Sequence, residues 1–185
     1  MTARAVALTS VIGLFRRHQP LSMFERQRAT LRTAAEFYPT PLAVAREMLD
    51  LAEAGPSDVV YDLGSGDARI PILAAQEFGC RAVGIELDPR LCRHARSQIQ
   101  EYGLNDRVVI QQQDFFEADL RPATVVTLYL LPAVNAQLCA RLASHLRPGA
   151  RVVTLEFPVP GWRPEHRLPV RSENGVEYTL YLYRR

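Results

Sequence analysis

The sequence predicts an α/β fold, with a mostly parallel β-sheet flanked by helices and preceded by an N-terminal helical extension. From residue 40 onward, short apolar runs of strand length alternate with longer segments of helical periodicity. Repeated β-α units of this kind build parallel sheets through right-handed crossovers. Near the C-terminus, two strand-like segments flank Glu173-Asn174-Gly175, a hairpin signal that predicts an antiparallel strand at one edge.

Two helices are expected before the first strand. Ser22 can cap a helix that runs to about residue 37, where Pro39 and Pro41 interrupt it because proline disfavours helix in the preceding residue. Thr40 is expected to cap a second helix with Pro41 at its first position. The sequence therefore predicts a domain at 37–185 behind an extension at 1–36.

The elements of the domain follow in order along the chain. Predicted strands cover 59–63, 81–85, 108–112, 125–130, 150–156, 167–171 and 176–183. Predicted helices cover 68–78, 89–102 and 133–146, and Pro71 is expected to interrupt the first of these. Gly103 ends the second helix and Pro148-Gly149 the third.

Composition limits the classes of partner. A formal net charge of +2 over 185 residues argues against a dedicated nucleic-acid binder, which usually carries a strong basic footprint. Residues 1–36 nevertheless hold six arginines against Glu25 and Glu36, so a peripheral membrane contact through this basic extension remains an alternative to a packed helix. The chain contains 22 arginines and no lysine. This fits either biased codon usage or a chain that lacks any side-chain amine that a lysine-modifying activity could attack.

Cysteine usage and hydropathy predict a cytoplasmic protein without a bound metal. Cys80, Cys92 and Cys139 are odd in number and lack the spacing of a metal site, so they are expected to be buried thiols in a reducing compartment. No apolar run reaches the length of a membrane span.

The segment 59–69, VVYDLGSGDAR, carries the strongest functional signal. A buried strand ends in Asp62 and leads through Gly64, Ser65 and Gly66 into a helix, the usual place for α/β proteins to bind a nucleotide-like ligand. A carboxylate at the strand end repels phosphate, and Arg69 occupies the position of the third glycine of the dinucleotide fingerprint. A ligand with an amine, a sulfonium and ribose hydroxyls fits this segment better.

Acids also follow the next two strands. Glu86 ends the second strand 22 residues after Gly64, the spacing at which an acid accepts hydrogen bonds from ribose hydroxyls, although such a residue could instead cap the following helix. Asp114 follows the third strand and could accept from an adenine amino group while Phe115 packs on the ring, or it could simply form a turn. Parallel strands place all three acids at one edge of the sheet.

Together these residues resemble the class I, seven-strand S-adenosylmethionine-dependent methyltransferases. The resemblance covers residues 37–185 and implies a Rossmann-like sheet of seven strands in the order 3-2-1-4-5-7-6, with strand 7 antiparallel. Four further stretches, at 37–41, 62–67, 125–132 and 157–162, are similar to lysine methyltransferases of the ATP synthase c-subunit type and their prokaryotic relatives. Ala68 departs from this family, whose members commonly have glycine there, and is expected to be a small change.

The resemblance implies a role for each matching residue. The aminoacyl portion of the cofactor would be held by Asp62, Gly64, Ser65 and Gly66, the ribose by Glu86, and the adenine by Asp114 and Phe115. Tyr38 and Thr40 would form a lid near the sulfonium, although Tyr38 could equally be a buried anchor. Tyr129 and Pro132 would form the mouth around the acceptor nitrogen, although Tyr129 could instead belong to the core.

The sequence therefore predicts a methyltransferase that uses S-adenosyl-L-methionine, with a protein lysine as acceptor. The short chain leaves little material for a cap over a small substrate, which favours a large acceptor supplied from outside. A small-molecule N- or O-methyltransferase and a non-catalytic cofactor-binding scaffold remain alternatives, and an NAD-dependent dehydrogenase is the least favoured. The acceptor, the number of methyl groups and the oligomeric state do not follow from the sequence.

Overall fold

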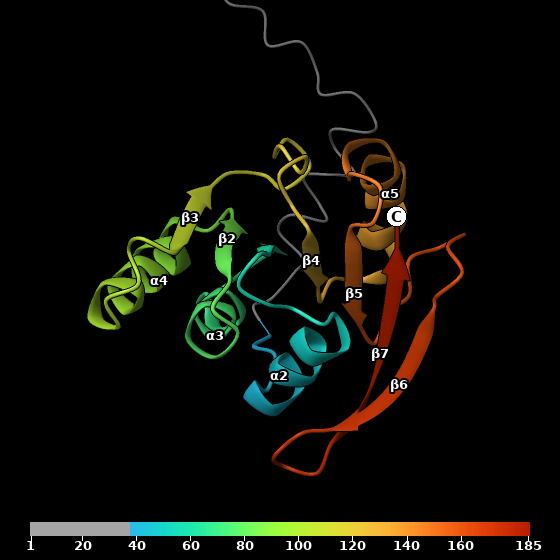
Figure 1. The fold of residues 1–185 in the computed structure, drawn as a ribbon, viewed down its shortest axis with the longest axis horizontal. Helices are drawn as coiled ribbons and strands as arrows, with labels where there is room; N and C mark the ends of the chain where they lie inside the picture. Colours follow the sequence, from blue (N-terminus) through green and yellow to red (C-terminus); the bar gives the residue numbers. More distant parts are fainter. Residues whose placement is uncertain (1–37) are drawn as a thin grey trace, which may run out of the picture. The chain divides into compact units, whose positions relative to one another are not determined.

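The computed structural model describes residues 38–185, which form a seven-stranded β-sheet with helices on both faces (Figure 1). The strands are β1 (Val59–Leu63), β2 (Arg81–Glu86), β3 (Val108–Gln112), β4 (Val125–Leu128), β5 (Arg151–Leu155), β6 (His166–Arg171) and β7 (Glu177–Arg184). Their order is β3-β2-β1-β4-β5-β7-β6, and β7 is the one strand that runs antiparallel to the others in the sheet. This confirms the predicted fold class. The predicted helix that starts at Ser22 lies outside the described residues.

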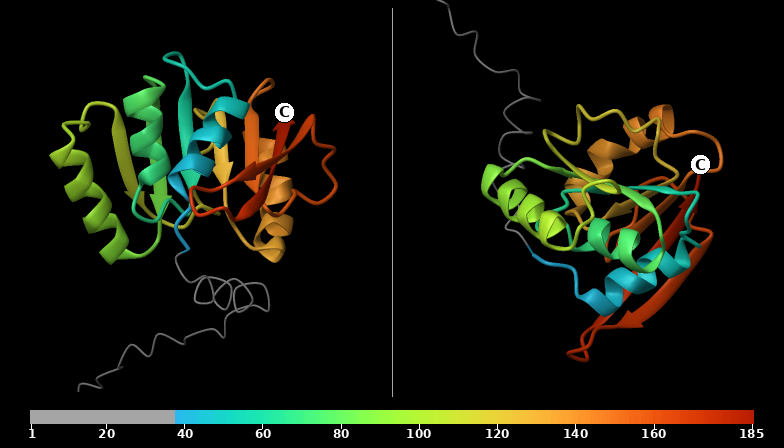
Figure 2. Two further views of the ribbon diagram at one scale, coloured as in Figure 1. Left: turned by 90° about the horizontal axis from the view of Figure 1, so that it is seen from below. Right: turned by 60° about the vertical axis from the view of Figure 1, so that its left-hand side comes forward.

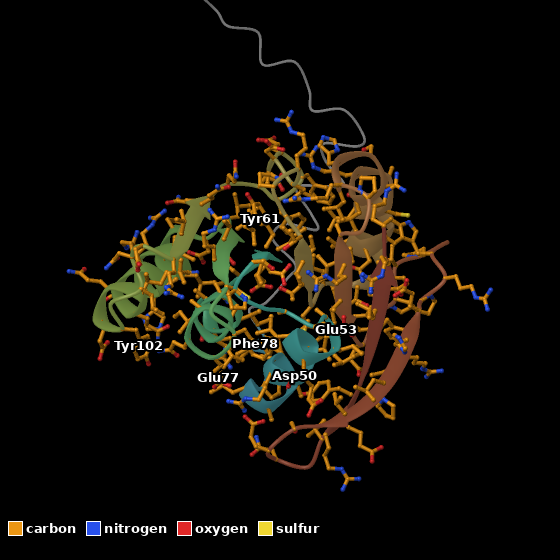
Figure 3. The ribbon with its side chains drawn as sticks, in the orientation of Figure 1. Asp50, Glu53, Tyr61, Glu77, Phe78 and Tyr102 are labelled. Carbon is orange, nitrogen blue, oxygen red and sulfur yellow. The ribbon has the colours of Figure 1, made fainter. Side chains whose placement is uncertain are left out.

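The four described helices are α2 (Leu42–Leu51), α3 (Arg69–Glu77), α4 (Pro89–Glu101) and α5 (Pro132–His145). In the right-hand view of Figure 2, α2, α3 and α4 cover one face of the sheet and α5 lies on the other. Arg46 of α2 forms an ion pair with Glu77 of α3, and Figure 3 shows Glu77 and Phe78 beside Asp50 of α2. None of the described helices combines the length and apolarity that crossing a bilayer requires.

The main core lies between the sheet and the three helices on its first face. Successive strand residues point to opposite faces, and Val60, Val125 and Leu155 join the apolar side chains of α2, α3 and α4 in one buried cluster. The opposite face packs Leu138 and Leu142 of α5, both fully buried. Because both faces of the central strands are buried, those strands are mostly apolar, and polar residues gather toward their carboxyl ends.

Two predicted helix starts were wrong in detail. The N-cap of α2 is Pro41 and no side chain caps it, so Thr40 lies one residue too early to be the cap. Instead, Glu173 of the β6–β7 turn accepts a hydrogen bond from the Leu42 N–H at 3.2 Å. Pro71 does not interrupt α3, because it occupies the first turn, where a backbone N–H would have no partner within the helix.

Candidate functional site

The loop between β1 and α3 is held against the end of β2 by its own backbone. The N–H groups of Gly64 and Ser65 donate to the carbonyl of Ile85 at 2.8 and 3.0 Å. The N–H of Gly66 donates to Glu86 Oε2 at 2.9 Å. Phosphate-binding loops present free N–H groups to the ligand, whereas these three are already engaged. This loop is therefore built for a ligand other than a phosphate.

Glycine is required by backbone conformation at two positions in this loop and by space at a third position, in β2. Gly64 and Gly66 have φ values of +80° and +54°, a region that side chains disfavour. Gly84 of β2 has no such constraint, but a Cβ there would lie 2.5 Å from Ser65 Oγ and 2.7 Å from Ile110 Cδ1. The loop thus packs directly on the backbone of β2, a close approach that only glycine permits.

Ser65 is 4 % exposed, and its hydroxyl lies against Gly84, beneath the loop. Within residues 38–185 this hydroxyl has no hydrogen-bond partner. Ala68 adopts φ +67° as the N-cap of α3, which explains why glycine suits this position in the related family. The departure at Ala68 is therefore a conformational strain rather than the minor change expected from the sequence.

Asp62 is a buried carboxylate at the centre of the site. It is 5 % exposed and accepts a hydrogen bond from Thr127 Oγ1 at 2.7 Å across the β1–β4 pair. The pKa of Asp62 is raised to about 7, chiefly by burial; the hydrogen bond from Thr127 opposes this rise, and the charges of Glu86 and Asp67 add to it. A buried acid with this pKa gains most from a ligand that brings a positive charge.

Glu86 joins two loops at the end of β2. Its Oε2 accepts from Gly66, and its Oε1 accepts from the N–H groups of Leu87 and Asp88 at 2.7 and 2.8 Å. It does not cap α4, because Asp88 is the N-cap and accepts from the Arg90 N–H at 2.7 Å. Glu86 remains half-buried beside the glycine loop, and its contact with a ribose stays a prediction.

Asp114 forms the turn that the sequence left open as an alternative. Its Oδ1 accepts from the Phe116 N–H at 2.9 Å, and its carbonyl accepts from the Glu117 N–H at the same distance. The Phe115 ring is half-buried, with its centroid 4.8 Å from that of Phe116. The turn therefore places Asp114 and Phe115 after β3, and their contact with an adenine stays a prediction.

Arg69 connects the segment before α2 to the glycine loop. Its guanidinium pairs with Asp67 at 2.6 Å and donates to the Thr40 carbonyl at 2.9 Å. Thr40 is 6 % exposed, whereas Tyr38 is 68 % exposed, so Tyr38 is not a buried anchor. The sequence identified Arg69 only as the residue that replaces a glycine, and no local pattern pointed to this positioning role.

The segment after β4 lies against the same loop. Leu130 Cδ2 is close enough to Gly64 that a Cβ there would meet it at 3.2 Å. The preceding Tyr129 is half-buried and makes an edge-to-face contact with Tyr38, with ring centroids 6.2 Å apart. Pro132 is exposed and begins α5, farther along the chain. The structure therefore brings Tyr38 and Tyr129 together, and the role of Pro132 stays a prediction.

A hollow of about 600 Å³ opens on the face of the sheet opposite the main core. It is lined by Tyr61, Gln111, Gln112, Gln113, Glu117, Asp119 and Pro122. Figure 3 shows Tyr61 away from Glu77 and Phe78, which end α3 on the other face. The hollow adjoins the carboxyl end of β3, but Asp62, Glu86 and Asp114 do not line it. Within residues 38–185, no three metal-ligating side chains gather in one place.

The arrangement suits a ligand that carries positive charge and hydroxyl groups. Asp62 and Glu86 lie beside the glycine loop, Asp67 belongs to it, and the N–H groups of Gly64, Ser65 and Gly66 are already bonded within the protein. Carboxylates accept hydrogen bonds from ammonium and hydroxyl groups, so the residues present fit an amine at Asp62 and a diol at Glu86.

Comparison with known proteins adds three findings. The family model for the ANTKMT methyltransferase domain matches residues 62–166. A protein-lysine N-methyltransferase of Saccharolobus islandicus is 43% identical over 80% of this chain and 91% of its own length. A Xenopus laevis lysine N-methyltransferase of the ATP synthase c-subunit is 35% identical over 69% of this chain, and the match spans only 56% of that relative.

A solved structure is also similar to the chain. It is described as an RNA methyltransferase from Salinibacter ruber in complex with S-adenosyl-L-homocysteine. That structure is 46% identical, superposes with a TM-score of 0.75, and is matched over 80% of this chain and 93% of its own.

Proposed function

The chain belongs to the family of the ANTKMT methyltransferase domain, and from this membership we propose that it transfers methyl groups from S-adenosyl-L-methionine to a lysine side chain of a protein. The family also confirms the resemblance on which the sequence-based prediction rested. The observation that carries the proposal is the set of carboxylates at a loop whose N–H groups are already bonded.

This observation favours S-adenosyl-L-methionine over a nicotinamide dinucleotide. A dinucleotide brings a pyrophosphate, which binds to free N–H groups at the glycine loop and is repelled by a carboxylate at the end of β1 such as Asp62. The solved relative from Salinibacter ruber is described with S-adenosyl-L-homocysteine, a molecule without phosphate. The same chemistry suits the loop of this chain.

In the proposed complex, each acid takes one part of the cofactor. Asp62 pairs with the ammonium group, Glu86 accepts from the ribose hydroxyls, and Asp114 and Phe115 contact the adenine. Arg69 holds the Thr40 carbonyl, and so positions Tyr38 near the reacting end. When bound, the cofactor supplies a methyl group on a sulfonium, and alignment of the acceptor supplies much of the rate acceleration.

The lysine acceptor is proposed from the relatives. The Saccharolobus and Xenopus proteins are both described as lysine N-methyltransferases, and the former is matched over nearly its whole length. The Salinibacter protein is described as an RNA methyltransferase, so RNA is the competing acceptor. A net charge of +2 favours protein, because RNA binding usually needs a strong basic footprint.

The test incubates the purified chain with methyl-labelled cofactor and a cell lysate. We expect label in a protein band that protease removes and nuclease leaves, with methylated lysine released on hydrolysis. The chain itself contains no lysine, so released methyllysine comes only from another protein. Nuclease-sensitive label would assign RNA as the acceptor, and label confined to small molecules would contradict a macromolecular acceptor.

Two variants control this experiment. Asp62→Asn keeps an oxygen that can accept from Thr127 but removes the charge, and we expect it to abolish both cofactor binding and labelling. Glu177→Gln changes an exposed carboxylate that pairs with Arg171 on the outer hairpin, and we expect normal labelling. Equal labelling by both variants would contradict the assigned cofactor site.

We also propose that the protein works in the cytoplasm, with the basic residues 1–36 as an optional contact to membrane surfaces. The unpaired thiols of Cys80, Cys92 and Cys139 support a reducing compartment. Cell fractionation tests this, since recovery in a periplasmic or secreted fraction would contradict it. Loss of vesicle binding on truncation of residues 1–36 would support the membrane contact.

A further inference from the structure

Three tyrosines from distant segments lie near one another at the carboxyl edge of the sheet. Tyr38 precedes α2, Tyr129 follows β4, and Tyr178 lies at the start of β7. Tyr38 and Tyr129 are in edge-to-face contact, and Tyr178 interacts electrostatically with both. Tyr129 and Tyr178 are half-buried against the main core, whereas Tyr38 is open to solvent. The rings therefore form an aromatic surface with one open side.

A carboxylate completes this surface. Glu156 follows β5 with φ +64°, and it pairs with β7 next to Tyr178: its N–H donates to the Thr179 carbonyl at 2.8 Å. Its Oε1 accepts from the Thr179 N–H at 2.6 Å. Glu156 interacts electrostatically with both Tyr129 and Tyr178. No arginine among residues 38–185 forms an ion pair with it.

The cluster adjoins the proposed cofactor loop. Tyr129 is followed by Leu130, which lies against Gly64, and Tyr38 belongs to the segment that Arg69 ties to the same loop. Burial raises the pKa of Tyr129, and Tyr178, Tyr38 and Glu156 raise it further. Burial likewise raises the pKa of Tyr178, so Tyr129 and Tyr178 stay protonated and can donate hydrogen bonds, and Glu156 is the carboxylate beside them.

We propose that Tyr38, Tyr129, Tyr178 and Glu156 together form the binding site for the charged amine of the acceptor, and we call them the acceptor cage. This rests on the proposed function and deepens it. A lysine amine with a pKa of about 10.4 arrives as an ammonium. Aromatic rings within about 6 Å attract such a cation, and a carboxylate adds a charge-assisted hydrogen bond.

The cage also accounts for how the amine is selected. A hydroxyl acceptor would gain little from the carboxylate, whereas an ammonium gains from both the rings and the charge. Glu156 is a binding residue in this assignment. Its loss should raise the KM for the acceptor far more than it lowers kcat, because the charge is used when the amine binds.

The test uses two small probes, N-acetyl-lysine methylamide and N-acetyl-norleucine methylamide, which share an apolar stem and differ in the charged amine. The protein carries ¹³C-labelled tyrosine rings and is saturated with S-adenosyl-L-homocysteine, and the seven tyrosine signals are assigned with Tyr→Phe variants. We expect the lysine probe, and not the norleucine probe, to shift the signals of Tyr38, Tyr129 and Tyr178. An equal response to both probes, or no response, would overturn the cage.

Glu156→Gln keeps an oxygen for the Thr179 N–H and removes only the charge. We expect it to lower the affinity for the lysine probe by roughly tenfold, about the effect of one charge-assisted contact. The affinity for S-adenosyl-L-homocysteine should be unchanged, which shows that the variant is folded. Glu177→Gln, which changes an exposed carboxylate at the start of β7, should leave the probe affinity unchanged.

The cage and the proposed function fail in different ways. If lysate proteins are labelled on lysine but Glu156→Gln labels them with the same KM, the cage is wrong and the function stands. If the lysine probe shifts the three rings but no lysate protein is labelled on lysine, the amine site stands and the protein acceptor is wrong.

Discussion

At the scale of single residues, the site depends on charges placed where water is scarce. Asp62 is buried among apolar strands and lies near two further acids, Glu86 and Asp67. The hydrogen bond from Thr127 stabilises its negative charge. Ionisation of such a buried carboxylate costs free energy, and a bound cation offsets that cost. The strand-end acid is therefore poised for a charged ligand rather than for structural support.

The raised pKa of Asp62 predicts a pH-dependent affinity. An ammonium group binds the ionised acid, so the affinity for S-adenosyl-L-homocysteine should rise as the pH increases through about 7. Between about pH 6 and pH 8 the ionised fraction grows roughly tenfold, and calorimetry should record a similar gain in affinity. In Asp62→Asn the affinity should be low and nearly flat over this range. A flat profile in the unmodified protein would place the ammonium elsewhere.

Arg69 provides a second prediction at this scale. Arg69→Met keeps the apolar stem but removes the donor to the Thr40 carbonyl and the partner of Asp67. We expect a loss of about 1 kcal/mol in the free energy of unfolding and a severalfold lower cofactor affinity, because the segment of Tyr38 loses its tether. Chemical denaturation and calorimetry measure the two effects.

Arg121→Met is the matched control for Arg69→Met. Arg121 forms the same kind of pair with the acid two residues earlier, Asp119, but it is exposed and makes no long-range contact among the described residues. Its loss should leave cofactor affinity unchanged. A similar drop in affinity for both variants would mean that the tether at Thr40 is not what Arg69 contributes.

At the scale of elements, the close packing of the β1–α3 loop on β2 decides where the strand-end acids lie. Gly84 leaves room for Ser65, and the loop then bonds through its N–H groups to Ile85 and Glu86. Two neighbouring strands are thereby joined at their carboxyl ends. This contact brings the ends of β1 and β2, with Asp62 and Glu86, to the same loop.

Gly84→Ala tests this packing. A Cβ at Gly84 would lie far inside contact distance of Ser65 and Ile110, so the loop must move away from β2. We expect a loss of about 1–3 kcal/mol in stability and a clearly weaker affinity for S-adenosyl-L-homocysteine. Denaturation and calorimetry provide the two measurements.

The control for Gly84→Ala is Gly55→Ala. A Cβ at Gly55 would have no atom within 4 Å, and the residue has no positive φ. The substitution should therefore cost nothing and can stabilise the chain by up to about 1 kcal/mol. If Gly84→Ala behaves like Gly55→Ala, the close packing of the loop on Gly84 does not determine the position of the loop.

At the scale of the whole domain, the two edges of the sheet have different tasks. At the amino edge, opposite the site, Arg151 at the start of β5 connects neighbouring segments. Its guanidinium pairs with the buried Asp58 and donates to the carbonyls of Ala52 and Glu53 beyond the end of α2. This ion pair joins three elements far from the carboxyl edge, so it contributes to stability rather than to binding.

Arg151→Met should therefore separate stability from function. Removing one partner of a buried pair leaves Asp58 uncompensated, and we expect a loss of about 3–5 kcal/mol in the free energy of unfolding. Affinity for S-adenosyl-L-homocysteine in the folded protein should be unchanged. Arg46→Met, which breaks the exposed pair with Glu77, should cost no more than about 1 kcal/mol. A loss of affinity in Arg151→Met would show that the two edges are coupled.

The sequence alone determined the fold class, the strand order implied by the family resemblance, and the acids at the ends of the first three strands. It could do so because the alternation of strand and helix patterns is local, and because parallel strands bring their carboxyl ends to one edge. Glu156 follows β5 in the same way, so the same pattern of an acid after a strand marks it in the sequence.

Only the tertiary structure brings together the residues of the proposed acceptor cage. Tyr178 reaches the carboxyl edge because β7 runs antiparallel and begins there, so its position depends on strand pairing rather than on any local motif. The link between Arg69 and Thr40, and the contact of Gly84 with Ser65, also join residues that are far apart in the chain. Such contacts depend on packing between elements, which no short sequence pattern encodes.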